Sequence, residues 1–209
     1  MFDIYNVINQ LKSIRNIFVS EADFQLELAW TIKELYPDAK VRMEYCPAFD
    51  SNMHIDILVI LDEKWIPIEL KYKTKGCKKT VNNEIYSLKN HGAKDVNCYL
   101  YLKDIERIER IRSNVDLFEE GYAILLTNEL SYLKRPTRDN VYYYNFSLEE
   151  GAVKSGTLDW HPDTSAGTKK NCEQPICLDD EYFVHWNEYS KLDDTNSGTF
   201  KVLVNKINK

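Results

Sequence analysis

The chain has 209 residues, of which 44% are hydrophobic and 29% charged, with only 7 glycines and 6 prolines. This composition is typical of a globular protein and excludes disordered, collagen-like and low-complexity chains. The net charge of -6 disfavours a protein that coats nucleic acid through its overall charge. The length suits one domain, so we expect a single core across residues 1–209.

The cysteines and the lengths of the apolar runs indicate in which cellular compartment the protein is expected. The five cysteines are odd in number and include no Cys-x-x-Cys pair, which favours free thiols in a reducing environment. No run approaches the roughly 20 consecutive apolar residues of a membrane-spanning helix, and the N-terminus lacks the pattern of a signal peptide. We therefore expect a cytoplasmic protein with no membrane partner.

Two amphipathic helices are predicted at the start of the chain. Apolar residues recur at helical spacing over residues 2–18. Ser20 then fits an N-cap, followed by the acidic residues Glu21 and Asp23, which predicts a second helix that runs to about Tyr36.

Strand and helix patterns alternate after the second helix. Strands are predicted at residues 41–46, 55–61, 65–72 and 122–127, and helices at 81–90 and 93–112. An order of helix, three strands, helix and strand predicts an α/β fold with a mixed sheet flanked by helices. This core would span about residues 20–127.

The pattern is less regular after Asn128. Strands are predicted at residues 142–146, 182–186 and 199–204, with a loop at 162–175. We expect these segments to form an irregular, β-rich C-terminal extension over about residues 128–209.

The third strand-like run places a carboxylate and a lysine two residues apart, at Glu69 and Lys71. Side chains alternate along a strand, so both should lie on the same face. Asp56, in the preceding run, can pair laterally with Glu69. Two adjacent carboxylates are unfavourable in a sheet unless a cation offsets their charge, and Lys71 offsets only one. A divalent ion that prefers oxygen ligands, Mg²⁺ or Mn²⁺, is therefore predicted.

The second predicted helix offers a third carboxylate. At 100° per residue, Glu21 and Gln25 lie on the same stripe as Leu28 and Ile32, which should pack on the sheet. Glu27 lies off that stripe. Because an acid in the first turn of a helix also interacts favourably with the helix dipole, Glu21 has two alternative roles.

These residues resemble the motif of a known family. Glu21, Asp56 and the run Glu69-Leu70-Lys71 look like the motif of the PD-(D/E)xK phosphodiesterase superfamily, which has the restriction-endonuclease-like fold. The order of elements over about residues 20–127 is similar to that family's αβββαβ core.

The resemblance implies a Mg²⁺-dependent endonuclease or exonuclease acting on nucleic acid. Asp56, Glu69, the Leu70 carbonyl and Glu21 would be metal ligands, and Lys71 would position or activate the attacking water. Gln25 would support these ligands. The chain departs from the motif immediately before Asp56, where the sequence has isoleucine and the motif has proline.

Lysines cluster directly after the motif, at Lys71, Lys73, Lys75, Lys78 and Lys79. Such a cluster would bind a phosphate backbone next to the metal without reading its sequence, although a solvated loop is the alternative interpretation. DNA is favoured over RNA as the partner. A homodimer is expected only if both strands of a duplex are cut.

A second hypothesis is a catalytically inactive binding or scaffold protein with the same fold. The complete set of Asp56, Glu69 and Lys71 favours the nuclease. In the superfamily, the helix after the third strand can line the substrate groove. His91 and Lys89, just before the helix at 93–112, are therefore conceivable substrate contacts, although neither belongs to a motif.

Overall fold

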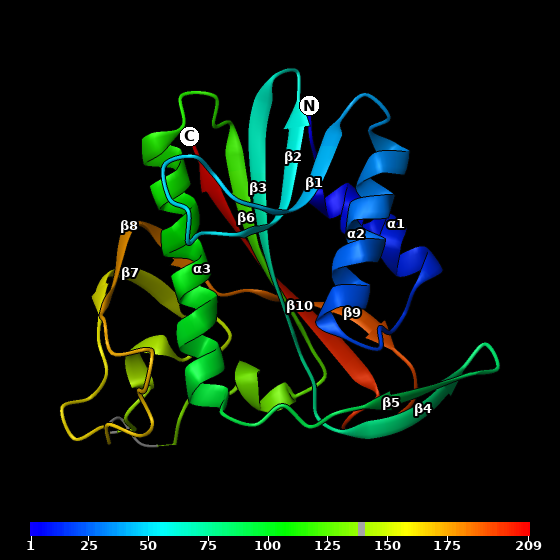
Figure 1. Ribbon diagram of the computed structural model, residues 1–209. Coiled ribbons are helices and arrows are strands. Elements are labelled where there is room, and N and C mark those ends of the chain that lie inside the picture. Colours follow the sequence, from blue (N-terminus) through cyan, green and yellow to red (C-terminus); the bar gives the residue numbers. More distant parts are fainter. Residues whose placement is uncertain (138–140) are drawn as a thin grey trace.

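The computed structural model describes residues 1–137 and 141–209. Within these residues, the centre is a six-stranded mixed sheet with the strand order β1-β2-β3-β6-β10-β9 (Figure 1). Its strands are β1 Lys40–Tyr45, β2 Ile55–Leu61, β3 Lys64–Lys73, β6 Glu120–Thr127, β9 Trp186–Lys191 and β10 Thr199–Asn208. The helices are α1 Ile4–Ile14, α2 Glu21–Leu35 and α3 Lys94–Asn114, with short 3-10 helices at Leu130–Leu133 and Tyr144–Phe146. Two hairpins lie outside the main sheet: β4 Cys77–Val81 with β5 Glu84–Leu88, and β7 Val153–Leu158 with β8 Ile176–Phe183.

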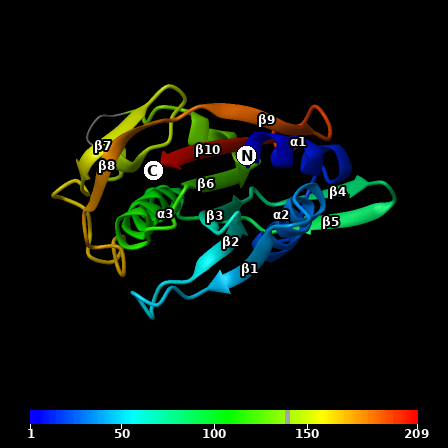
Figure 2. The same cartoon turned by 90° about the horizontal axis from the view of Figure 1, so that it is seen from above.

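Helices cover both faces of the sheet, α1 and α2 on one side and α3 on the other (Figure 2). Ile68 and Leu70 of β3 belong to the core beneath α1 and α2. Leu58 of β2 and Leu125 of β6 belong to the core beneath α3. Because each central strand is buried on both faces, its sequence is nearly continuously apolar.

The predicted α/β order of elements is present as α2, β1, β2, β3, α3 and β6. β1, β2 and β3 pair antiparallel, whereas β6 pairs parallel to β3. A parallel neighbour requires a crossover, and the chain from β4 through α3 provides it. The crossover carries α3 over the face of the sheet that Leu58 and Leu125 occupy.

The predicted start of the second helix is confirmed. The Ser20 Oγ accepts a hydrogen bond from the Asp23 N–H at 3.1 Å. The first helix is shorter than the predicted range of 2–18. Asp3 caps its start by accepting hydrogen bonds from the N–H groups of Tyr5 and Asn6, and the helix ends at Ile14 because Arg15 is extended.

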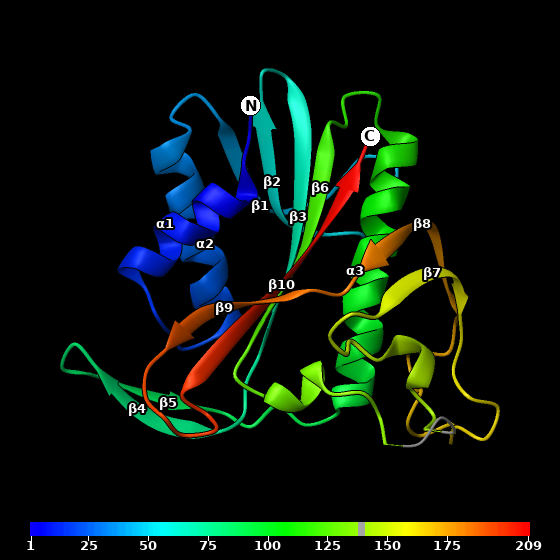
Figure 3. The ribbon, with the colours of Figure 1, turned by 180° about the vertical axis from the view of Figure 1, so that it is seen from behind.

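The predicted helix at residues 81–90 is wrong, because this segment contains the turn of the β4–β5 hairpin. Asn82 and Asn83 form the two-residue turn with φ values of 51° and 66°. Asparagine tolerates this left-handed conformation, which matches the twist of a hairpin. Figure 3 shows the hairpin extending away from the end of the main sheet.

The C-terminal segment is not only an extension, because β9 and β10 belong to the main sheet. β10 pairs along its length with β6, so residues 199–204 form a strand as predicted and the strand continues to Asn208. The predicted strand at 142–146 is wrong and contains a 3-10 helix, whereas the predicted strand at 182–186 spans the end of β8 and the start of β9. Residues 162–175 contain no helix or strand, as predicted. No helix in the described part of the chain is long and apolar enough to cross a membrane.

Candidate functional site

The two strands that carry the predicted carboxylates lie side by side. The β2–β3 ladder pairs Ile57 with Ile68, and Asp56 and Glu69 follow immediately beyond that pair. The Leu70 N–H donates a hydrogen bond to the Asp56 Oδ2 at 2.6 Å. Burial raises the pKa of Asp56, and the positive charge of Lys71 opposes this rise. The structure thus brings together Asp56 and Glu69, as the sequence predicts.

The carboxylate of Glu69 is fully buried, with a side-chain exposure of 0%. The Arg107 Nη2 lies 3.2 Å from the Glu69 Oε1, yet among the described residues no group donates a hydrogen bond to either carboxylate oxygen. Burial, reinforced by the negative charges of Asp104 and Asp56, raises the pKa of Glu69 well above its usual value. A buried carboxylate without hydrogen bonds is unusual and is a candidate cation ligand.

Lys71 lies on the same face as Glu69 but contacts a different carboxylate. Its Nζ lies 2.6 Å from the Asp104 Oδ2 on α3 and donates a hydrogen bond to the Leu70 carbonyl at 3.0 Å. Burial alone lowers the pKa of Lys71, but the negative charges of Asp104 and Asp56 outweigh it and the net pKa is raised. The amine is therefore held in its charged form.

Arg107 contacts both Glu69 and Asp104. Besides contacting Glu69, its Nη1 lies 3.4 Å from the Asp104 Oδ1, and its Nη2 donates a hydrogen bond to the His54 carbonyl. This places one guanidinium between α3, β3 and the chain entering β2. The cluster of Asp56, Glu69, Lys71, Asp104 and Arg107 is called the charged cluster below.

Asp104 and Arg107 are the members of the charged cluster that the sequence interpretation missed. The charges at 104–112 are spaced three and four residues apart, a pattern of ordinary surface support in a helix. A signal was nevertheless present, because Asp104 falls on the same helical stripe as the buried residues Tyr101, Ile105 and Ile108.

Glu21 and Gln25 lie beneath the opposite face of the sheet and bind backbone groups. The Glu21 Oε2 accepts hydrogen bonds from the Tyr72 N–H at 2.7 Å and from the Lys73 Nζ at 3.0 Å. The Gln25 Nε2 donates to the Asp56 carbonyl at 2.7 Å and to the Glu44 Oε1 at 2.8 Å. Gln25 thus supports Asp56, whereas no hydrogen bond or ion pair in the described residues joins Glu21 to the charged cluster.

The predicted lysine patch divides into engaged and free side chains. Lys73 pairs with Glu21, and Lys79 lies 2.6 Å from the Asp193 Oδ2. Lys75 and Lys78 are exposed, and in the described part of the chain no ion pair involves either ammonium group. Both lie on or just before β4, where the chain leaves β3.

His91 and Lys89 lie where the chain returns from the hairpin towards α3. The His91 Nδ1 accepts a hydrogen bond from the Thr74 N–H at 3.0 Å. Burial lowers the pKa of His91, and the nearby charge of Lys73 lowers it further. The exposed Lys89 adds a positive charge at the root of the hairpin.

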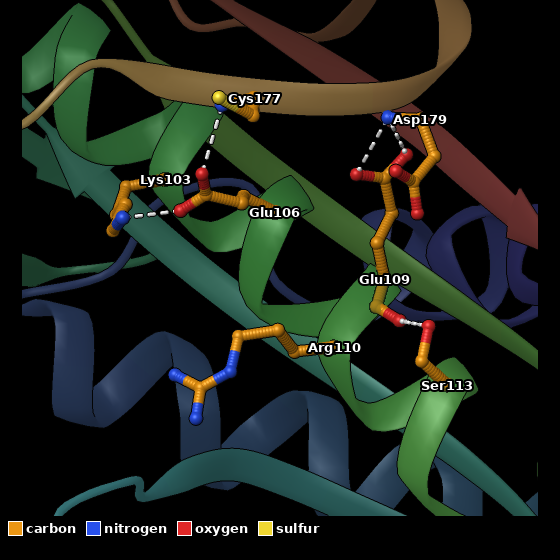
Figure 4. A pocket seen from close by; sticks show the side chains of 7 residues that line it. All are labelled: Lys103, Glu106, Glu109, Arg110, Ser113, Cys177 and Asp179. Atoms are coloured by element: carbon orange, nitrogen blue, oxygen red, sulfur yellow. Dashed lines mark hydrogen bonds and ion pairs between the residues drawn. The ribbon is translucent and has the colours of Figure 1, made fainter.

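A separate shallow pocket of about 360 Å³ lies between α3 and β8 (Figure 4). Its carboxylates are already engaged. The Glu106 Oε1 accepts a hydrogen bond from the Cys177 N–H at 2.8 Å, and the Glu109 Oε1 accepts one from the Asp179 N–H at 3.0 Å. These contacts hold β8 against α3, so the pocket has a structural explanation.

The donors at the charged cluster suit a hard divalent cation. Asp56, Glu69 and the Leu70 carbonyl provide oxygen ligands, and the oxygens of Glu69 are not used in hydrogen bonds. Among the described residues, no group of three or more carboxylate, histidine or cysteine side chains is arranged to hold a metal. Mg²⁺ is commonly held by one or two carboxylates and completed by water and phosphate oxygens, so a Mg²⁺ ion at Asp56 and Glu69 stays a prediction.

Comparisons with known proteins give no match. No protein-family model matches the sequence, and neither the curated proteins nor the solved structures contain a significant match. The resemblance to the PD-(D/E)xK superfamily therefore remains one of motif and element order.

Proposed function

We propose that the protein is a metal-dependent nuclease-like hydrolase of phosphodiester bonds in nucleic acid, with DNA favoured over RNA. The observation that carries this proposal is the buried carboxylate of Glu69, which accepts no hydrogen bond and lies beside Asp56 and Lys71. The PD-(D/E)xK motif and the order of elements agree with it. In this proposal the fold is restriction-endonuclease-like.

The proposed roles follow from the charges of the residues. When bound by Asp56, Glu69 and the Leu70 carbonyl, a Mg²⁺ or Mn²⁺ ion would polarise the phosphate and lower the pKa of a bound water. Lys71, held as a cation by its neighbours, adds positive charge where negative charge develops during hydrolysis.

Residues on α2 would support the site from the other face of the sheet. Gln25 fixes the backbone of Asp56 through its carbonyl. Glu21 is proposed as an additional ligand or catalytic residue at the end of β3, where one of its oxygens is engaged by the Tyr72 N–H and Lys73.

The proposed nucleic-acid contact is the β4–β5 hairpin and its root. Lys75, Lys78 and Lys89 supply exposed positive charge there, directly after the strand that carries Lys71. Lys73 and Lys79 could contribute only by leaving their carboxylate partners. Such contacts would be sensitive to salt and insensitive to base sequence.

We also propose that the protein acts in the cytoplasm, where the five free cysteines would remain reduced. Cleavage of both strands of a duplex would require two such sites, and a homodimer would provide them.

A second candidate is an inactive binding protein with the same fold. Asp104 and Arg107 already neutralise Lys71 and part of the charge of Glu69, so the charged cluster is partly compensated without a cation. On this alternative the cluster stabilises the contact between α3 and the sheet, and the hairpin binds a partner.

The deciding experiment measures cleavage of single- and double-stranded DNA and RNA with Mg²⁺ or Mn²⁺, together with Mn²⁺ binding by calorimetry. Asp56→Ala and Glu69→Ala should lose both cleavage and binding. Asp116→Ala, at an exposed carboxylate between α3 and β6, is the matched control and should retain both. A wild-type protein that neither binds Mn²⁺ nor cleaves any of these substrates would support the inactive binding protein.

A further inference from the structure

Asp104 is a carboxylate in an apolar position. It lies on the face of α3 that packs on the sheet, among the buried residues Tyr101, Ile105 and Ile108. Its side chain is only 5% exposed. A carboxylate in such a place is unfavourable unless it has a charged partner, and that partner is Lys71.

The ion pair with Asp104 determines which carboxylate the Lys71 ammonium contacts. Glu69 and Lys71 are two residues apart on one face of β3, so a flexible lysine side chain could reach Glu69 instead. In the structure the ammonium lies 2.6 Å from Asp104, while both oxygens of Glu69 accept no hydrogen bond. Arg107 contacts both acids, at 3.2 Å from Glu69 and 3.4 Å from Asp104.

We propose that Asp104 is a positioning residue that holds the Lys71 ammonium away from Glu69 and so keeps Lys71 from competing with a metal ion for the Glu69 carboxylate, which lies 3.2 Å from the Arg107 Nη2. The inference rests on the proposed function, because it concerns the same site. Asp104 itself need not touch the metal or the substrate. When the Asp104 carboxylate is removed, the Lys71 ammonium pairs with Glu69 and competes with the metal ion for it.

A double-mutant cycle tests this competition with a measurement that does not require cleavage. Mn²⁺ affinity is measured by calorimetry for the wild type, Asp104→Asn, Lys71→Met and the double variant. In the presence of Lys71, Asp104→Asn should weaken Mn²⁺ binding by about 10-fold or more, the range typical of residues that orient metal ligands. In the Lys71→Met background the same substitution should change affinity by less than about threefold, because no lysine remains to pair with Glu69.

Two further variants separate positioning from general effects. Asp104→Glu keeps a carboxylate near Lys71 and should restore most of the lost affinity. Asp180→Asn breaks an exposed ion pair with Arg112 elsewhere on α3 and should leave affinity unchanged. Thermal unfolding of each variant confirms that the measured protein is folded.

The outcomes distinguish this inference from the proposed function. If wild type binds Mn²⁺ but Asp104→Asn weakens binding equally with and without Lys71, the effect is the loss of a nearby negative charge and the positioning role is wrong. Unchanged binding in Asp104→Asn also overturns it, while the metal site stands. A wild type that binds no Mn²⁺ overturns both the metal-dependent function and the positioning role.

Discussion

The Lys71 Nζ lies 2.6 Å from the Asp104 Oδ2, and the two side chains are 14% and 5% exposed. This ion pair joins β3 to α3 inside the layer between sheet and helix. Burying two charges is favourable only when each compensates the other. Loss of Asp104 would leave the Lys71 ammonium buried without this partner, and loss of Lys71 would leave Asp104 with the longer contact to Arg107 at 3.4 Å. The pair therefore affects stability as well as the chemistry proposed for Lys71.

Lys71→Met should lower the free energy of unfolding by about 3 kcal/mol, because Asp104 then remains buried without its ammonium partner. Glu69→Gln should change that free energy by only about 1 kcal/mol, because loss of the contact with the partly exposed Arg107 is offset by relief of the repulsion from Asp104 and Asp56. Urea denaturation at pH 7 measures both. If the two variants lost equal free energy of unfolding, the ammonium of Lys71 would stabilise the Glu69 carboxylate as much as it stabilises the Asp104 carboxylate.

Gly121, next to α3, should not tolerate a side chain. A Cβ added at Gly121 of β6 would clash with the Ile108 Cγ2, one turn along α3 from Asp104. Gly121→Ala should therefore push α3 outwards and lower the free energy of unfolding by about 1–3 kcal/mol, as overpacked cores do. Mn²⁺ affinity should fall as well, because the helix that carries Asp104 and Arg107 moves.

Gly92→Ala is the matched control for Gly121, since a Cβ there meets nothing within 4 Å. It should leave stability and Mn²⁺ affinity near those of the wild type. Combining Gly121→Ala with Ile108→Ala should cost less stability than the sum of the two single changes, because the second removes the atoms that clash. Additive losses would show that the close approach of β6 and α3 does not limit packing.

The strands and helices that carry the predicted site were predictable because their patterns are strong. β2 and β3 are almost entirely apolar runs, and Ser20 with Asp23 marks the start of α2. A period of two along β3 was enough to place Glu69 and Lys71 on one face. Their actual partners could not be predicted from that local pattern, since Asp104 and Arg107 reach the cluster through tertiary packing of α3.

The hairpin and the C-terminal strands were less predictable for a similar reason. Residues 81–90 have apolar residues at spacings that suit either a short helix or a strand, and the Asn82-Asn83 turn decides between them. Tyr182 ends in a sheet with β7, whereas Trp186 begins a strand beside β10. A continuous apolar pattern gives no indication that the chain changes sheets between them.

Glu21 provides a test of its two alternative roles. Its Oε2 anchors the backbone of β3 at Tyr72 and also pairs with Lys73. Glu21→Gln keeps an oxygen acceptor but removes the charge, so it should lower the free energy of unfolding by about 1 kcal/mol or less. If Glu21 serves mainly as this anchor, Mn²⁺ affinity should fall far less than in Asp56→Ala. A loss as large as that of Asp56→Ala would instead identify Glu21 as a metal ligand.

The attachment of the hairpin should depend on acid pH. Lys79 of β4 contacts the Asp193 Oδ2 at 2.6 Å and donates a hydrogen bond to the Thr195 Oγ1 at 2.7 Å, linking the hairpin to the loop between β9 and β10. Lys79, with help from Thr195, lowers the pKa of Asp193 from 3.8 to about 2. For a carboxylate with a lowered pKa, the stabilisation is present above the unfolded value and disappears as pH falls through the folded value. The link should therefore be intact above about pH 4 and be lost between about pH 4 and pH 2.

Hydrogen-exchange protection factors of the β4 amides, measured at pH 5 and at pH 2.5, test this dependence. Wild-type protection at β4 should drop at the lower pH more than protection at the buried strand β6, because Lys79 of β4 contacts Asp193 directly. Asp193→Asn should show low protection at both pH values, since its amide cannot form the ion pair with Lys79. Protection in Asp193→Asn that still falls between pH 5 and pH 2.5 as steeply as in the wild type would show that another carboxylate anchors the hairpin.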